Sequence, residues 1–236
     1  MNFRDYSIFI LALLLTACST NLILQSHDNK VIGIQARADS TILSIITPYQ
    51  AGIEDQMSEV LTYTKNDLEK GRPQSTMGNF VTDLCLNYAD ADICVMNNGG
   101  LRTTFSEGGI TRGNLYELMP FENELVILEL DKDDYLDLLN YIGRSGGEPF
   151  SGFTIVLDND GKIIRNSWPV NFENGERVRV LTSDYLANGG DKMSFFKQKK
   201  QQKVGIKFRD AIIDYCSKKD TINIQLDDRI ITLGNE

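Results

Sequence analysis

The sequence predicts one α/β domain over residues 39–236, with a mixed sheet and flanking helices, and three observations support this fold class. Stretches with apolar residues three and four positions apart alternate with short runs rich in valine and isoleucine. This alternation is typical of a mixed α/β domain and contains no internal repeat and no low-complexity tract. The composition is that of an ordinary globular domain, with 42% hydrophobic and 24% charged residues.

The residues ahead of this domain are predicted to be a targeting signal and a tether. An apolar run from Ile8 to Leu15 is far shorter than the roughly 20 residues that span a bilayer. Small residues directly before Cys18 complete a pattern typical of bacterial lipoprotein signals. We therefore expect a signal peptide over 1–17, a lipid on Cys18, an anchor and tether over 18–38, and a place in the bacterial cell envelope, periplasmic or surface-facing. The alternative is a signal cut after a small residue, with Cys18 a bystander.

The first elements are expected to be a short strand at 32–34 and, from Asp39 onward, a pair of helices. Apolar residues from Ile42 to Leu61 recur at helical spacing, and Pro48 interrupts them. Because proline has no backbone N–H to donate, we place the break between the two helices near Pro48.

A capped helix and a buried strand follow. Ser75 or Thr76 is placed to cap a helix whose apolar stripe runs from Phe80 to Tyr88. Residues 92–96, Asp-Ile-Cys-Val-Met, predict a short buried strand. The remaining expected elements are a short helix over 111–118, a strand over 124–130, an amphipathic helix through Tyr135 and Ile142, strands over 153–157, 162–165 and 176–183, and a late helix over 204–216.

Charge and residue counts exclude several classes of function. A net charge of −9 argues against nucleic acid as a partner, because phosphate backbones require a basic face, and the lysine-rich run over 197–203 is interpreted as a solvated loop. Histidine occurs once, at His27, whereas most metallohydrolase sites and histidine dyads need one inside the domain. Cys85, Cys94 and Cys216 have apolar neighbours, so we expect buried, unpaired thiols, the alternative being a disulfide.

Three loops carry side chains suited to holding a ligand. Residues 97–102, Asn-Asn-Gly-Gly-Leu-Arg, combine glycines for close approach, amides that donate and accept, and a planar guanidinium for an oxyanion. In residues 119–123 a proline stiffens the turn that carries Phe121, and in residues 183–191 an aromatic ring and glycines precede Asp191. Singly, each loop also has a structural explanation, as a tight turn, a core ring or a helix cap. Together the rings, the carboxylate and the arginine suit a base, ribose hydroxyls and a phosphate, the parts of a nucleotide.

These loops give the sequence a resemblance to the C-terminal domain of the 5′-nucleotidase family. The matching motifs are Met77-Gly78-Asn79, residues 97–102, Pro120-Phe121 and residues 185–191, in family order across nearly all of residues 39–236. By this resemblance Phe121 and Tyr185 stack on the base, and Asp191 holds the ribose hydroxyls. Asn97 touches the base edge, and Arg102 contacts the ribose or the phosphate. The full implied substrate-binding set is Arg72, Asn97, Gly99, Gly100, Arg102, Phe121, Tyr185, Asn188, Gly190 and Asp191.

The departures from the family are informative. Asn98 stands where a glycine is common, and Tyr185 stands where phenylalanine is usual. Complete members also carry a metallophosphatase domain whose aspartate, histidine and asparagine residues hold two divalent metals, and we expect residues 39–236 to lack it.

The resemblance therefore implies a nucleotide-specificity subunit of a 5′-nucleotidase-type hydrolase in nucleotide catabolism. We expect no catalytic residue, metal ligand or cofactor in this chain, with the divalent metals in a separate metallophosphatase subunit. The expected partners are a nucleoside or nucleotide, that subunit, and a membrane through the lipid on Cys18. The alternatives are a stand-alone surface module that captures nucleosides or nucleotides for uptake, and a remnant that binds nothing.

Overall fold

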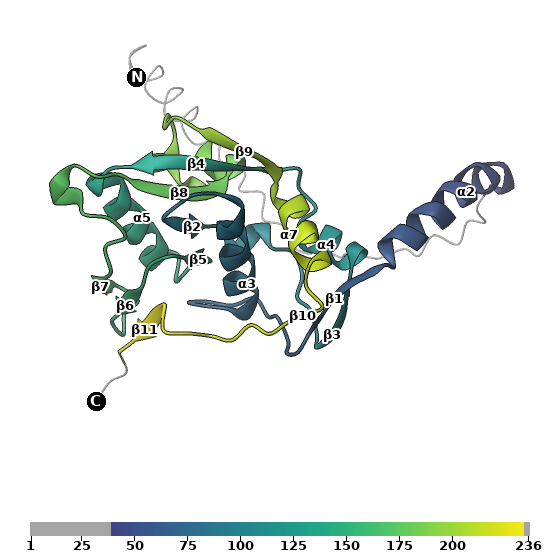
Figure 1. The fold of residues 1–236 in the computed structure, drawn as a ribbon, viewed down its shortest axis with the longest axis horizontal. Coiled ribbons are helices and arrows are strands. Elements are labelled where there is room, and N and C mark those ends of the chain that lie inside the picture. The colour runs from purple at the N-terminus through teal and green to yellow at the C-terminus, as the bar shows by residue number, and fades with distance from the viewer. Residues whose placement is uncertain (1–38, 234–236) are drawn as a thin grey trace, which may run out of the picture. The chain divides into compact units, whose positions relative to one another are not determined.

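The structure, a computed structural model, describes residues 39–233 (Figure 1). Contacts divide the chain into a first unit that ends at Ser44 and a second unit that begins at Ile45. Helix α2 (Ser40–Met57) begins in the first unit and ends in the second. The predicted signal peptide, Cys18, the tether and the strand at 32–34 lie outside the described residues. Within residues 39–233 no helix is both long enough and apolar enough to cross a membrane.

A five-stranded mixed sheet forms the centre of the second unit, in the order β5–β2–β8–β4–β9. β2 and β8 run parallel to each other, whereas β4 runs antiparallel to both of its neighbours. This mixture of strand directions, with helices flanking the sheet, confirms the predicted fold class. The strands are β2 (Ile93–Val95), β4 (Glu124–Leu130), β5 (Phe150–Ser151), β8 (Val178–Ser183) and β9 (Gln202–Lys207).

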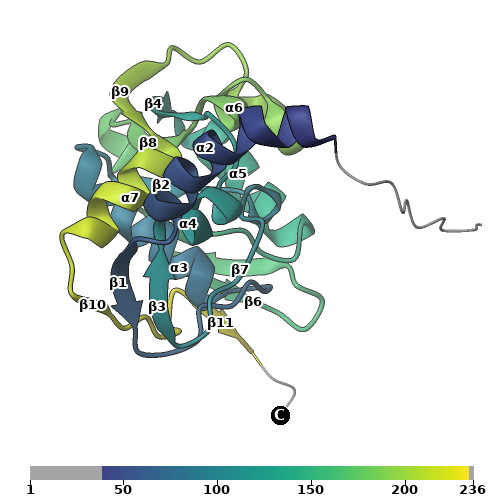
Figure 2. The ribbon, with the colours of Figure 1, turned by 90° about the vertical axis from the view of Figure 1, so that its right-hand side faces the viewer.

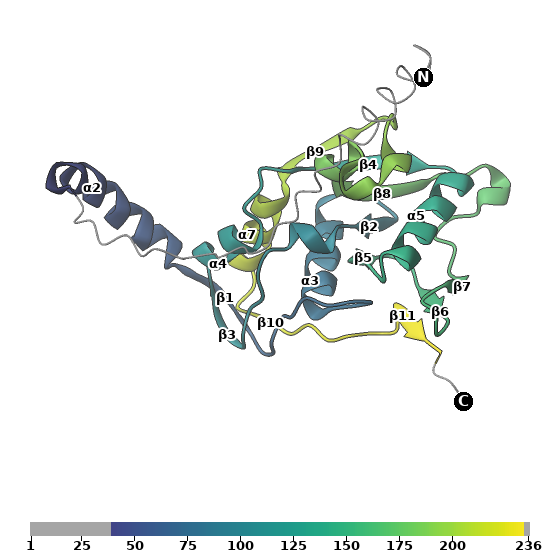
Figure 3. The same ribbon diagram turned by 180° about the vertical axis from the view of Figure 1, so that it is seen from behind.

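Both faces of this sheet are buried. In β4, Leu125 and Ile127 belong to one apolar cluster, and Val126 and Leu128 belong to another, because successive side chains of a strand point to opposite faces. The first cluster includes residues of α3 (Thr76–Cys85), α4 (Arg112–Leu118) and α7 (Phe208–Ser217), and the second includes residues of α5 (Lys132–Arg144). Figures 1 and 3 show α5 on one side of α3 and both α4 and α7 on the other.

Smaller elements complete the second unit. Figure 2 shows β1 (Val60–Thr64) between β3 (Gly108–Thr111) and β10 (Thr221–Ile222), which together form a three-stranded sheet. A second three-stranded sheet has the order β11–β6–β7, with bounds Ile230–Thr232, Ile155–Leu157 and Ile163–Asn166. The short helix α6 spans Asp184–Ala187, and single 3₁₀ turns span Leu86–Tyr88, Asn98–Gly100, Phe172–Asn174, Gly190–Lys192 and Ser194–Phe196.

Capping residues fix the starts of the main helices. The Ser75 hydroxyl accepts a hydrogen bond from the backbone N–H of Gly78 at 3.0 Å, so the predicted cap of α3 is confirmed. Thr111 and Asp131 form capping boxes at the starts of α4 and α5. Such caps satisfy N–H groups that have no partner inside the helix.

Three predicted boundaries are wrong. α2 continues through Pro48 instead of breaking there, so the loss of one backbone donor does not divide the helix. Val60 and Leu61, expected in a helix, begin β1, where pairing with β3 and β10 overrides the local apolar spacing. The late helix begins at Phe208 rather than at residue 204, because residues 202–207 pair with β4 at the edge of the central sheet.

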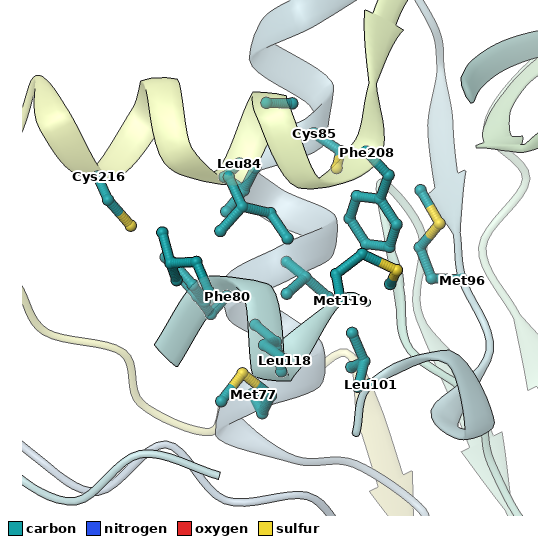
Figure 4. Packing of buried hydrophobic residues seen from close by; sticks show 14 of the residues in the cluster. Met77, Phe80, Leu84, Cys85, Met96, Leu101, Leu118, Met119, Phe208 and Cys216 are labelled. Atoms are coloured by element: carbon teal, nitrogen blue, oxygen red, sulfur yellow. The ribbon is translucent and has the colours of Figure 1, made fainter. Parts of the chain in front are cut away.

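Figure 4 shows part of the first cluster, in which methionine, leucine and phenylalanine side chains pack together. Leu101, Met119 and Phe208 belong to one buried cluster, and they come from the loop after β2, the loop after α4 and the start of α7. The three cysteines of the described chain are free and buried, as predicted. Burial raises the pKa of Cys216 to about 12, so this thiol stays protonated near neutral pH.

Candidate functional site

The strand directions bring the three predicted loops to one edge of the central sheet. β2 and β8 are parallel neighbours, so the loops that follow them leave the sheet at the same edge. β4 is antiparallel to β8, with Leu125 opposite Ser183, so the loop that precedes β4 reaches that edge too. Residues 97–102, 119–123 and 183–191 therefore converge.

These loops enclose a cavity of about 350 Å³, which is within the usual range for small-molecule sites. It is lined by Asn97, Gly99, Gly100, Arg102, Phe121, Asn123, Tyr185 and Asp191. All but Asn123 belong to the set that the sequence singles out. A larger hollow of about 640 Å³ lies around Trp168 and contains none of the predicted residues.

The two aromatic rings of the cavity are not core residues. Phe121 is 42% exposed and Tyr185 is 45% exposed, whereas Phe150 in the core is 1% exposed. The carbon at the centre of the Arg102 guanidinium lies 6.0 Å from the centroid of the Phe121 ring. A flat ligand therefore has access to two aromatic faces and to one cation in the same cavity.

Asp191 is held from several sides. Its two carboxylate oxygens accept hydrogen bonds from the Tyr185 hydroxyl, at 2.9 Å, and from the Asn97 side-chain amide. Its backbone carbonyl accepts a hydrogen bond from the Tyr141 hydroxyl at 2.8 Å. Burial raises the pKa of Tyr141 to about 12, so its hydroxyl remains a donor at neutral pH. Each carboxylate oxygen keeps a second lone pair for a ligand hydroxyl.

At two positions a neighbouring side chain lies so close to the backbone that only glycine fits. A Cβ atom on Gly190 would lie 2.5 Å from the Tyr185 ring, and a Cβ atom on Gly100 would lie 2.7 Å from the Asn97 side-chain oxygen. Both distances are too short for carbon, so any larger residue would displace the Tyr185 ring or the Asn97 amide. Gly190 thus shapes the cavity without lining it.

Comparison with known proteins identifies the family. The family described as 5′-nucleotidase, C-terminal domain, matches residues 57–198, more than half of the chain. The chain belongs to this family. The loops at residues 97–102, 119–123 and 185–191, which surround the cavity, lie within the matched segment.

Similar proteins and solved structures are longer than this chain. A 5′-nucleotidase of Vibrio vulnificus is 27% identical over 173 residues, which are 66% of this chain and 30% of that protein. Endonuclease YhcR of Bacillus subtilis is 32% identical over 133 residues, 53% of this chain and 11% of that protein. The crystal structure of a 5′-nucleotidase precursor from Thermus thermophilus superimposes with a TM-score of 0.67 at 26% identity, covering 83% of this chain and 43% of that one. This chain spans less than a third of the length of these two curated relatives.

Besides Gly190, two residues of the family-implied set, Arg72 and Asn188, do not line the cavity. Arg72 forms an ion pair with Glu148 at 2.8 Å and donates to the carbonyl oxygens of Ser145, at 2.6 Å, and Gly147. Asn188 is exposed and accepts a hydrogen bond from the Gln201 side chain at 3.0 Å. In this structure both side chains have partners within the protein, and their roles in binding stay predictions.

The sequence analysis did not assign a role to Asn123, which lines the cavity, or to Glu148, which supports one of its loops. The Glu148 side chain is only 4% exposed, and it accepts a hydrogen bond at 2.8 Å from the backbone N–H of Asn98 while pairing with Arg72. It therefore holds the start of the 97–102 loop. The local sequence gives no signal for Glu148, because its partners Arg72 and Asn98 are distant in sequence. Asn123 has a signal, since it lies in the 119–123 loop.

The described part of the chain has no cluster of side chains that could bind a divalent metal. Within residues 39–233 no group of three or more histidine, cysteine, aspartate or glutamate side chains is placed to hold a metal ion. The two-metal centre that the family resemblance implies therefore does not fit these residues.

Proposed function

We propose that this protein is the nucleotide-recognition part of a 5′-nucleotidase-type hydrolase. The observation that carries the proposal is the single cavity that joins two half-exposed rings, a preoriented carboxylate and an arginine. In this proposal Phe121 and Tyr185 stack on the base and Asp191 accepts hydrogen bonds from the ribose hydroxyls. Arg102 is the group in the cavity best suited to a phosphate, because its guanidinium offers several donors in one plane.

The proposal places the phosphoester chemistry on a separate chain. Hydrolysis of a phosphate ester needs an activated water and neutralisation of the transferring phosphoryl group, which a metallophosphatase partner with divalent metals would supply. This chain would contribute binding and orientation of the substrate. A lipid on Cys18 would hold it at a membrane of the bacterial envelope.

A stand-alone module that captures nucleosides or nucleotides for uptake is the second candidate. The same cavity supports it, and a capture module needs no metal ligands in residues 39–233. The two candidates share the binding step and differ only in whether a partner hydrolyses the ligand.

Calorimetric titration with adenosine, guanosine, cytidine, uridine and their 5′-monophosphates tests the shared binding step. Stacking of a base on one ring contributes about 1–3 kcal/mol, so Phe121→Ala and Tyr185→Ala should each weaken binding by about five- to a hundredfold. Tyr63→Ala is a matched control, because Tyr63 is 54% exposed on β1 and does not line the cavity. A folded Tyr185→Ala protein that binds as tightly as the wild type would contradict the proposal.

A further inference from the structure

Arg209 is a nearly buried cation, and apolar packing gives no reason for a charge at this position. It is the second residue of α7, and its side chain is only 6% exposed. A charged group is costly to remove from water unless it is paired and hydrogen-bonded. The partners of Arg209 therefore indicate what the residue does.

All of these partners belong to one short segment. One guanidinium nitrogen of Arg209 donates to the carbonyl oxygens of Met119, at 3.1 Å, and Phe121, at 3.4 Å. The other terminal nitrogen pairs with the Glu122 carboxylate. The guanidinium also lies over the Tyr116 ring, with 4.3 Å between its central carbon and the ring centroid. The Arg209 guanidinium is thus hydrogen-bonded to the backbone on both sides of Pro120.

The residues next to Arg209 hold the same segment. The backbone N–H of Phe208 donates to the carbonyl oxygen of Asn123 at 2.8 Å, and the Lys207 ammonium pairs with Glu122. Hydrogen bonds from Lys207 and Arg209 lower the pKa of Glu122 to about 2, so its carboxylate is charged at neutral pH. Three consecutive residues at the β9–α7 junction therefore fix the segment that carries the Phe121 ring.

We propose that Arg209 is a positioning residue for the Phe121 ring, fixing the loop at residues 119–123 so that the ring faces the cavity ready for a base. Residues 119–123 lie between α4 and β4, so no helix or strand hydrogen bonds hold the backbone of Phe121. The ring itself is 42% exposed, so packing alone does not set its direction. A ring that is already oriented binds a base without a further cost of ordering the loop. This inference rests on the proposed role of Phe121 in binding the base.

The variants separate positioning from general stability. Arg209→Met removes the charge and the fork, and Arg209→Lys keeps the charge but cannot reach both carbonyl oxygens and the carboxylate together. Glu122→Gln keeps the size of the side chain and removes the charged partner of Arg209. This variant replaces Arg209→Met in the test if Arg209→Met does not fold. Arg179→Met is the control, because Arg179 pairs with Asp90 near the start of β8, at the opposite end from the cavity.

Two readouts test the proposal. The first is affinity for the nucleoside among adenosine, guanosine, cytidine and uridine that binds the wild type most tightly. Arg209→Met should weaken binding by about three- to tenfold, less than the loss of the ring itself, with Arg209→Lys intermediate and Arg179→Met unchanged. In the Phe121→Ala background the same substitution should change affinity by less than about twofold, because coupled residues are non-additive.

The second readout is hydrogen exchange of the peptide 115–124 without ligand, which should be faster in Arg209→Met and Glu122→Gln and unchanged in Arg179→Met. The proposal would be overturned if Arg209→Met weakened binding equally in the wild-type and the Phe121→Ala backgrounds. It would also be overturned if the folded variants exchanged hydrogen in peptide 115–124 at the wild-type rate. If no nucleoside binds the wild type, the proposed function fails, and the exchange rates still decide whether Arg209 holds the loop.

Discussion

Asp191 combines an unusual backbone conformation with an unusually complete set of partners. Its φ angle is +48°, in the left-handed region that most side chains avoid and aspartate tolerates better than most. Its backbone N–H donates to the Tyr185 hydroxyl at 3.2 Å, in addition to the bonds made by its carbonyl and carboxylate. A conformation of this kind persists only where the surroundings hold it, so the position of the carboxylate is fixed before a ligand arrives.

Replacing Asp191 with asparagine tests the role of its charge. The Asp191→Asn side chain keeps the size of the original and the tolerance for positive φ, but its amide is a weaker acceptor for two hydroxyls. Since a hydrogen bond to a charged group contributes about 1.5–3 kcal/mol, affinity for adenosine should fall by about tenfold or more, and affinity for 2′-deoxyadenosine should fall less. Calorimetry on both ligands measures the difference. Equal losses for the two would mean that Asp191 supports the loop and does not contact the ribose.

At the scale of elements, the sequence predicted what depends on local pattern. The helix capped by Ser75, the buried strand β2 and the glycine-containing loops were found because spacing, capping and turn residues are local signals. The β9–α7 boundary was missed because residues 202–207 become a strand only by pairing with β4. Glu148 and Arg209 were missed for the same reason, since each acts on a loop far away in the sequence.

The capping box of α5 gives the domain a defined acid dependence. The backbone N–H of Asp134 donates to the Asp131 carboxylate at 3.1 Å, and this bond lowers the pKa of Asp131. A group whose pKa is lower in the folded state stabilises the fold above its unfolded pKa and loses that contribution as the pH falls through its folded pKa. The stability that Asp131 provides should therefore be complete at neutral pH and disappear in acid.

Asp131→Ala should accordingly lower the free energy of unfolding by about 1 kcal/mol at pH 7, the usual contribution of an N-cap. The difference from the wild type should shrink as the pH falls below roughly 4, because the carboxyl of the unfolded chain is protonated first and that of the folded protein only at lower pH. Urea denaturation between pH 7 and pH 3 measures this difference, with Asp160→Ala in an exposed turn as the control. A difference that does not change with pH would show that the cap does not depend on the charge.

For the molecule as a whole, the lipid anchor is the prediction that concerns location. The pattern before Cys18 predicts that this residue carries the lipid, so Cys18→Ser should move the protein from the membrane fraction to the soluble fraction. Fractionation of cells that express the wild type and the variant measures the shift. Lys30→Ser, in the predicted tether, is the control and should stay with the membrane. Equal partitioning of Cys18→Ser and the wild type would contradict the anchor.

Catalysis is the prediction that separates the two candidate functions. With the single histidine of the chain at His27 and no grouped metal ligands in residues 39–233, the purified protein with Mn²⁺ should release no phosphate from AMP. Mixing it with a single-domain metallophosphatase of the same organism should produce hydrolysis that Tyr185→Ala weakens. Binding without hydrolysis in any such mixture would favour the capture module. Phosphate release by the protein alone would refute the two-chain proposal if Tyr185→Ala lowers it, because a contaminating phosphatase would not respond to that substitution.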